Sequence, residues 1–283
     1  MRAEAFEACR PRLFAVAYGM LGDRGEAEDV VQDAWLRFTD AAEIRNAEAF
    51  LVTVTTRLSI DRFRSARARR ETYVGPWLPE PLVADPARTD PAEVVAEAEQ
   101  LSLALLTALE RLNPVERAVF LLRDVFDLEY AEIADAVGRT PANCRQIAGR
   151  ARGHVGEPAR RRPVSPDEEQ RVVAAFAAAV EAGDVAALMA VLATDANTYS
   201  DGGGVVPAAR KVIYGAAKTA RLMIGLRRRL GETPPMTFVR VNGDPGLRVD
   251  GEPGTASVLA LEIADGRIAN VRIVNNPEKL TRV

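Results

Sequence analysis

The N-terminal part of the chain, residues 1–71, has the hydrophobic spacing of amphipathic helices. Within 26–38 the apolar residues recur three or four positions apart, which predicts one buried stripe on a helix. These residues are Ala27, Val30, Val31, Ala34, Trp35 and Phe38. After a short polar segment, 40–46, a helix is expected over about 47–70. Its inward-facing residues would be Leu51, Val54, Leu58 and Phe63. The pattern predicts an all-α unit.

Proline interrupts this pattern over 72–91, where the segment contains five prolines. Because proline blocks helix continuation, 72–91 is predicted to be an extended linker. It ends in a helix start signal: Asp90 as the N-cap, Pro91 as the first helical residue and Glu93 as the reciprocal cap.

Residues 92–157 return to helical spacing, and 113–116 (NPVE) repeats the start signal. A helix carrying Ile133 and Ala134 inward ends at Gly138, and Thr140 with Pro141 begins the next one. This spacing predicts a helix-turn-helix.

A second linker, 158–165, leads to Ser165, which is expected to cap a helix with Glu168. Beyond it, 166–283 reads as an α+β domain. Helices are expected over about 167–193 and 216–229, and β-like runs bounded by Gly, Asp and Asn occupy much of the remainder. Leu259, Leu261 and Ile263 recur with period two, and the strands are predicted to form a curved antiparallel sheet.

Charge is unevenly distributed along the chain. Its formal net charge is −3, yet 57–70 contains six arginines with one acid and 139–162 contains seven with one acid. Such clusters indicate contact with a polyanion, although a solvated helix face is the alternative. Two cysteines and one histidine predict neither a disulfide framework nor a zinc site. The charged N-terminus and the lack of a long apolar run favour a cytoplasmic protein that does not enter a membrane.

The outer face of the second helix of the helix-turn-helix carries groups that suit phosphates and base edges in a major groove. They are Thr140, Asn143, Arg145, Gln146, Arg150 and Arg152. An ordinary helical hairpin is the alternative. Gly149 lies inside this helix at a local cost of roughly 1 kcal/mol, and the sequence does not explain it.

Two stretches of the N-terminal part, GDRGEAEDVVQDAWLRF and AFLVTVTTRLSIDRFRSARARRE, resemble region 2 of extracytoplasmic-function sigma factors of bacterial RNA polymerase. The helix-turn-helix resembles their region 4. The resemblance implies an alternative sigma factor that binds core RNA polymerase and initiates transcription at promoter DNA. It assigns polymerase docking to Asp29, Gln32, Asp33 and Arg37. The −10 element would be bound by Asn46, Arg57, Asp61, Arg62 and Arg64, and the −35 element by the Thr140–Arg152 helix.

Three further motifs resemble sigma factors that carry a fused SnoaL-like domain, an α+β cone of the NTF2 type: WLPEP (77–81), DGGG (201–204) and NPEKL (276–280). The resemblance implies regulation in cis. The residues implied are Trp77, Pro79, Glu80, Pro81, Asp201, Gly202, Gly203, Gly204, Asn276, Pro277, Glu278 and Lys279. In the family a lysine commonly follows the glycines, whereas Val205 stands there in this chain. A glycine turn with positive φ and a rigid linker with one buried tryptophan are the alternative interpretations.

Two other functions compete with this hypothesis. SnoaL-like relatives catalyse proton transfers with Asp and His, but 166–283 contains no histidine. Asp195, Asp201 and Tyr199 are the candidate pocket residues, and they form no recognisable acid–base pair. We therefore expect no catalysis, no cofactor and no metal, and a small ligand in the cavity of the cone remains open. A ligand-responsive repressor is the second alternative, although it would not need the unit resembling region 2.

Overall fold

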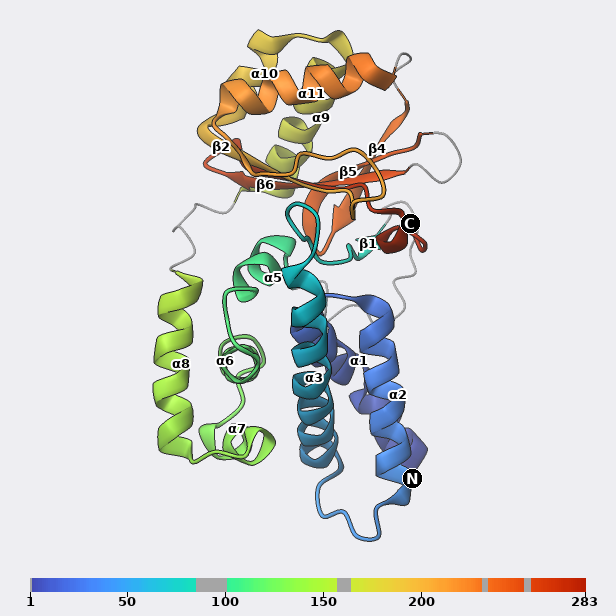
Figure 1. The fold of residues 1–283 in the computed structure, drawn as a ribbon, viewed down its shortest axis with the longest axis vertical. Helices are drawn as coiled ribbons and strands as arrows, with labels where there is room; N and C mark the ends of the chain where they lie inside the picture. Colours follow the sequence, from blue (N-terminus) through green and yellow to red (C-terminus); the bar gives the residue numbers. More distant parts are fainter. Residues whose placement is uncertain (1, 85–100, 157–163, 231–233, 252–255) are drawn as a thin grey trace. The chain divides into compact units, whose positions relative to one another are not determined.

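The structure is a computed structural model that describes residues 2–84, 101–156, 164–230, 234–251 and 256–283 (Figure 1). The described residues form two compact units. The helical unit contains 2–72 and 101–156, and the α+β unit contains 73–84 and the described residues from 164 onward. Residues 73–84 lie within the segment expected to be a linker, and they belong to the α+β unit.

Three helices form the first half of the helical unit: α1 (Arg2–Leu21), α2 (Arg24–Asp40) and α3 (Ala47–Glu71). Side-chain caps set two of the starts. Asp23 accepts a hydrogen bond from the Glu26 amide (2.8 Å), and Asn46 accepts one from the Ala49 amide (3.1 Å). The predicted stripe of α2 is buried apart from Trp35, which is half-buried against the ring of Phe6.

The inward face of α3 agrees only in part with the sequence prediction. Leu51 and Phe63 are buried, whereas Val54 and Leu58 are half-buried.

Shorter helices form the second half: α5 (Leu103–Leu109), α6 (Pro114–Phe120), a π-helical turn η2 (Leu121–Val125), α7 (Tyr130–Val137) and α8 (Pro141–Val155). The predicted helix-turn-helix is α7 and α8. Gly138 ends α7 with φ of 65°, and Thr140 caps α8 through the Asn143 amide (3.2 Å). The helix start expected at Asp90, Pro91 and Glu93 lies outside the described residues.

The α+β unit has the sheet order β1-β4-β5-β6-β7-β2-β3, with α9, α10 and α11 on one face (Figure 1). The helices are α9 (Pro166–Ala182), α10 (Val185–Val191) and α11 (Ala216–Leu230). The strands are β1 (Val83–Ala84), β2 (Leu192–Asp201), β3 (Ile213–Tyr214), β4 (Met236–Val241), β5 (Asp244–Val249), β6 (Ser257–Ala264) and β7 (Arg267–Val274). A 3₁₀ turn, η3 (Pro277–Lys279), follows the last strand.

The sheet is mixed, so the expectation of a fully antiparallel sheet is wrong. β2 and β7 pair in parallel, while the other paired strands are antiparallel. A parallel pair needs a long connection, and here α11 and four strands lie between the two in the chain. β1 was also not foreseen: Val83 pairs with Val241, so the proline-rich segment adds a short edge strand.

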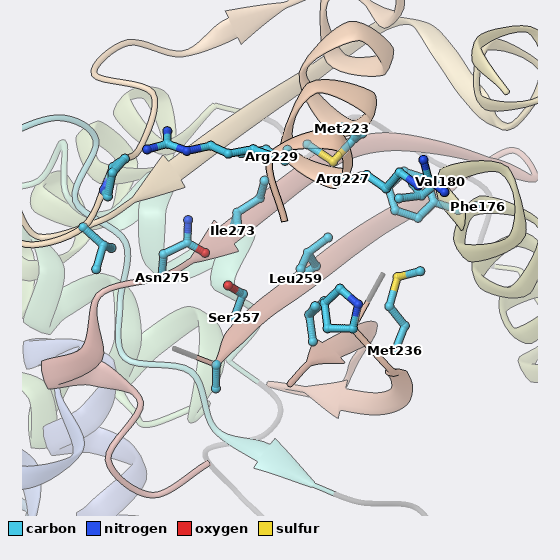
Figure 2. A pocket seen from close by; sticks show the side chains of 16 residues that line it. Phe176, Val180, Met223, Arg227, Arg229, Met236, Ser257, Leu259, Ile273 and Asn275 are labelled. Atoms are coloured by element: carbon cyan, nitrogen blue, oxygen red, sulfur yellow. The ribbon is translucent and has the colours of Figure 1, made fainter. Parts of the chain in front are cut away.

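A cavity of about 360 Å³ lies beside the hydrophobic core of this unit (Figure 2). Its walls come from α9, α11, the strands β4 to β7 and the Val206–Pro207 segment. Of the described residues, no helix combines the length and hydrophobicity that crossing a bilayer requires.

Candidate functional sites

The outer face of α2 carries the four residues expected to dock on a protein partner, and two of them are already paired. Asp29 and Asp33 lie 3.4 Å and 3.7 Å from the guanidinium of Arg62 on α3. Ion pairs at this level of exposure contribute little stability. Gln32 and Arg37 are exposed. Arg62 also donates to the Glu26 carbonyl, so it spans the two helices at this face.

The arginine-rich side of α3 contacts the second half of the helical unit. Arg57 donates hydrogen bonds to the carbonyl oxygens of Asp135 (2.6 Å) and Ala136 (3.1 Å) on α7. Asp61 and Arg64 pair with each other at 2.8 Å on an exposed surface. The structure therefore brings Arg57 to the helix-turn-helix.

Two residues of the expected set hold internal structure. Asn46 caps α3, and Arg57 joins α3 to α7. Asn46 and Arg57 are also both exposed.

The exposed face of α8 presents the donors expected from the sequence. Cys144 and Ile147 are buried, which leaves Arg145, Gln146 and Arg150 exposed. The Arg145 guanidinium lies 5.2 Å from the centre of the Tyr130 ring, a distance typical of a cation–π contact.

Two further positions of α8, Arg152 and Gly149, differ in their surroundings. Arg152 is paired with Asp124 at 2.7 Å. A Cβ built on Gly149 would meet no atom within 4 Å, so packing within the protein does not require this glycine.

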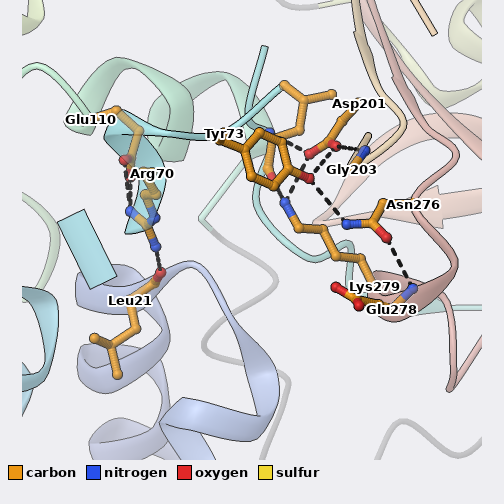
Figure 3. Close-up of polar contacts among 10 residues, drawn as sticks. Leu21, Arg70, Tyr73, Glu110, Asp201, Gly203, Asn276, Glu278 and Lys279 are labelled. Atoms are coloured by element: carbon orange, nitrogen blue, oxygen red, sulfur yellow. Dashed lines mark hydrogen bonds and ion pairs between the residues drawn. The ribbon is translucent and has the colours of Figure 1, made fainter. Parts of the chain in front are cut away.

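A buried ionic cluster in the helical unit was not predicted. Glu110 accepts hydrogen bonds from Arg70 on α3, as Figure 3 shows, and from Arg117 on α6. Arg117 is fully buried and also donates to the Gly19 carbonyl (2.9 Å), while Arg70 donates to the Leu21 carbonyl.

The charges of this cluster depend on one another. Burial alone would raise the pKa of Glu110, but the guanidinium groups of Arg117 and Arg70 outweigh it and lower that pKa. Burial lowers the pKa of Arg117, and Glu110 opposes this effect. Glu110 is therefore ionised at neutral pH, and its single negative charge is shared between the two arginines.

The α+β unit holds a second buried polar site, centred on Asp201 at the end of β2 (Figure 3). Its carboxylate is fully buried and accepts hydrogen bonds from the Tyr73 hydroxyl, the Leu78 amide (2.8 Å) and the Gly203 amide (3.0 Å). Lys279 completes the site with an ion pair at 2.8 Å. We call residues 73–84 the strap and these contacts the strap site.

Lys279 and Asn276 connect the C-terminal turn to the strap. Besides its bond to Asp201, Lys279 donates to the Leu78 carbonyl, and its ammonium lies 4.4 Å from the centre of the Trp77 ring. The Asn276 amide donates to the Tyr73 hydroxyl (3.0 Å). Burial, together with the hydrogen bond to Asp201, raises the pKa of Tyr73, so its hydroxyl stays protonated and donates.

The three motifs WLPEP, DGGG and NPEKL therefore meet at one place. Pro79, Glu80 and Pro81 are buried, and Pro277 and Glu278 lie in the η3 turn that Asn276 caps. The cation beside Asp201 is Lys279 of NPEKL, whereas Val205, the residue that follows the glycines, is exposed.

The DGGG glycines are needed for close approach and for backbone conformation. A Cβ on Gly202 would lie 2.4 Å from the Val206 carbonyl oxygen, and one on Gly203 would lie 2.5 Å from the Asn276 amide nitrogen. Gly203 and Gly204 also have positive φ, 65° and 75°. The glycine turn expected as one alternative is therefore present, and it packs closely against Asn276 within the α+β unit.

Sequence reasoning missed Tyr73, which lies just before the WLPEP motif. A single tyrosine at the edge of a proline-rich segment gives no periodicity or spacing signal. It also missed Arg70, Glu110 and Arg117, which resemble ordinary surface charges of amphipathic helices in the sequence.

Comparison with known proteins identifies both halves of the helical unit. Residues 5–69 match the family model of Sigma-70 region 2, and residues 102–155 match that of Sigma-70 region 4. The chain is 37% identical to the ECF RNA polymerase sigma factor SigJ of Mycobacterium tuberculosis, over 99% of this chain and 94% of that protein. It is 34% identical to the probable ECF sigma factor SigI of the same species, over 98% and 93% of the two chains.

The whole fold also has a solved counterpart. The crystal structure of M. tuberculosis SigJ superposes with a TM-score of 0.82 at 35% sequence identity, covering 99% of this chain and 98% of that one.

Proposed function

Because the chain belongs to the extracytoplasmic-function family of RNA polymerase sigma factors, which are promoter-recognising transcription initiation factors, we propose that its α+β unit controls initiation in cis through the strap. The observation that carries this proposal is the fully buried Asp201, which holds Tyr73 and Leu78 of the segment joining region 2 to region 4.

The residues proposed to meet the transcription machinery lie on separate faces. Asp29, Gln32, Asp33 and Arg37 on α2 would dock on core RNA polymerase. Their support is exposure and polar character on a helix whose opposite stripe is buried. The ion pairs of Asp29 and Asp33 with Arg62 are weak enough to exchange for contacts with a partner.

Promoter DNA would meet two arginine-bearing surfaces. The −10 element is proposed to contact Asn46, Arg57, Asp61, Arg62 and Arg64, and the −35 element the exposed side of α8. Among the α8 residues, the exposed Arg145, Gln146 and Arg150 provide the donors that base edges and phosphates accept. Thr140, Asn143 and Arg152 would orient or extend that contact.

The strap gives the α+β unit a physical means of control. Region 2 and region 4 are joined through residues 73–84, and holding those residues on the unit leaves fewer connecting residues to span the two regions. A connection of fewer residues restricts the separations that the two DNA-binding surfaces can reach. Release of the strap would widen this range, so any change at the strap site would alter promoter use.

The α+β unit is proposed to act by binding, without catalysis. Its part of the sequence has no histidine, and the two candidate acids differ in their surroundings: Asp195 is exposed and Asp201 is engaged at the strap site. A small ligand in its cavity is a further part of the proposal. Since a transcription initiation factor acts on the chromosome of a bacterium, we place the protein in the cytoplasm.

The test is transcription with bacterial core polymerase on fragmented genomic DNA, with transcript 5′ ends identified by sequencing. Wild-type protein is expected to initiate at a defined set of promoters. Asp201→Asn is expected to change the yield at those promoters, while the matched control Asp195→Asn, an exposed position on the same strand, should not.

Two results would count against the proposal in different ways. Unchanged yield with Asp201→Asn would refute control through the strap. If the wild-type protein does not bind core polymerase and yet binds promoter fragments alone, it would act as a repressor.

A further inference from the structure

The cavity of the α+β unit has an apolar interior of the size that small molecules occupy. Its volume of about 360 Å³ lies within the range of roughly 300–1,000 Å³ typical of ligand sites. The apolar part of the cavity wall includes Leu226 and five side chains labelled in Figure 2: Phe176, Met223, Met236, Leu259 and Ile273. Such a wall favours a ligand with a hydrocarbon body.

The charged side chains that line this cavity among the described residues are positive. Arg227 and Arg229 of α11 line the cavity, and no acidic residue does so among the described residues. In Figure 2 the Arg227 side chain extends toward Phe176 and Val180 of α9, whereas Asn275 lies on the other side of the cavity. The two polar positions are therefore separated by the apolar wall.

Two polar atoms of this wall are buried and have no hydrogen-bond partner among the described residues. They are Nε of Arg227 and Oδ1 of Asn275. Buried polar atoms in folded proteins are nearly always paired, and an unpaired charged group is especially costly. Arg227 requires an acceptor, preferably a charged one, and the Asn275 oxygen requires a donor.

We propose that the cavity binds an amphipathic carboxylic acid, with its hydrocarbon body along the apolar wall and its carboxylate on the guanidinium of Arg227. A planar guanidinium binds a carboxylate through paired hydrogen bonds, which a neutral head group cannot reproduce. A hydroxyl on the hydrocarbon body would satisfy Asn275. This inference deepens the ligand part of the proposed function by naming the ligand class.

The cavity wall is continuous with the strap site. The backbone amide of Asn275 donates to the Asp201 carbonyl (2.8 Å), and the amide of Val206 donates to the Gly202 carbonyl (3.0 Å). Both donors belong to residues that line the cavity, and both acceptors belong to the DGGG motif. Through these two hydrogen bonds, a ligand in the cavity would act on the segment that holds Tyr73 and Leu78.

Methionine methyl NMR on the full-length protein locates the binding directly. The chain has five methionines, and of these Met223 and Met236 line the cavity while Met20 and Met189 do not. Titration with decanoate is expected to shift the Met223 and Met236 methyl signals and leave those of Met20 and Met189 in place. Decanol, which has the same chain and no charge, is expected to bind at least tenfold more weakly.

Arg227→Met removes the charge and keeps an apolar side chain of similar length. It is expected to weaken decanoate binding by roughly tenfold or more and to leave decanol binding nearly unchanged. Arg228→Met is the matched control, because Arg228 is exposed on the same helix and does not line the cavity. A thermal melt of each variant establishes that it is folded.

Three outcomes would overturn the proposal. They are no methyl shift with decanoate, equal affinity for decanoate and decanol, or an equal loss of decanoate affinity in Arg227→Met and Arg228→Met. All of these measurements use the protein without polymerase or DNA. A failed titration therefore refutes the ligand site alone, whereas failed initiation in the transcription assay refutes the proposed function.

Discussion

Replacing Glu110 with glutamine is expected to destabilise the helical unit by about 3 kcal/mol. The substitution keeps the shape of the side chain and removes the one negative charge between Arg70 and Arg117. Arg117 is fully buried, and one of its terminal nitrogens already lacks a hydrogen bond. The variant would therefore hold an uncompensated cation in the interior.

The magnitude follows from how deeply the cluster is buried. Breaking a buried ion pair by removing one partner typically costs about 3–5 kcal/mol. The Glu110 side chain keeps 23% of its surface exposed, which places the loss at the lower end of that range. With a urea slope of about 1–3 kcal/mol per molar, the unfolding midpoint should fall by roughly 1–3 M.

The two tryptophans allow each unit to be followed separately. Trp35 lies in the helical unit and Trp77 in the α+β unit, so urea unfolding of a Trp77→Phe background reports the helical unit through Trp35. Glu7→Gln is the matched control. Glu7 pairs with Arg10 on an exposed helix surface, and its loss should cost less than about 1 kcal/mol.

The pH dependence gives an independent check. The arginines lower the pKa of Glu110 in the folded state, so its contribution is present above the unfolded pKa and is lost as pH falls through the folded value. The difference in the free energy of unfolding between wild type and Glu110→Gln should therefore become smaller at acidic pH. A difference below about 1 kcal/mol at pH 7, or one that widens toward low pH, would refute the reasoning.

Three further changes have defined outcomes. Burial raises the pKa of Asp244 in the folded protein to about 7. The folded state therefore loses stability as pH rises from the pKa of Asp244 in the unfolded chain toward 7. Asp244→Asn should raise the melting temperature, and by more at pH 8 than at pH 5. Gly149→Ala should stabilise the helical unit by roughly 1 kcal/mol in urea unfolding, because a methyl group there meets open space; a loss of stability would contradict this. Lys279→Met leaves the Asp201 carboxylate buried without its cation, so the α+β unit should lose about 3 kcal/mol, read by Trp77 fluorescence; an unchanged midpoint would show that the ion pair is not needed.

The helices were predictable from sequence because their signals are local. The caps Thr140 and Ser165 lie within three residues of the amides they bind, and the stripe of α2 repeats within a few turns. The helix-turn-helix followed from Gly138 and Thr140 in the same way. Short-range chemistry of this kind is visible in a single sequence.

The polar sites were not predictable, because their members are far apart in the chain. Tyr73 and Asp201 are separated by 128 residues, and Leu78 and Lys279 by 201. The motifs suggested that these segments matter, but only the fold shows that a single carboxylate joins them. The parallel pairing of β2 with β7 escaped prediction for the same reason, since the hydrophobic period of a strand does not specify the direction of its partner.

The contact of Arg57 with α7 bears on how the helical unit must change when it meets a promoter. Two of the guanidinium N–H groups of Arg57 donate to the carbonyls of Asp135 and Ala136, so these donors cannot bind phosphate at the same time. If a contact with the −10 element uses these same donors, α3 and α7 must first separate, whereas a contact through the remaining N–H groups of Arg57 leaves them together. Hydrogen bonds from a charged donor contribute about 1.5–3 kcal/mol each, a cost that contacts with polymerase and DNA can offset. Under the proposed control in cis, a strap that limits the separation of the two halves would oppose that same step.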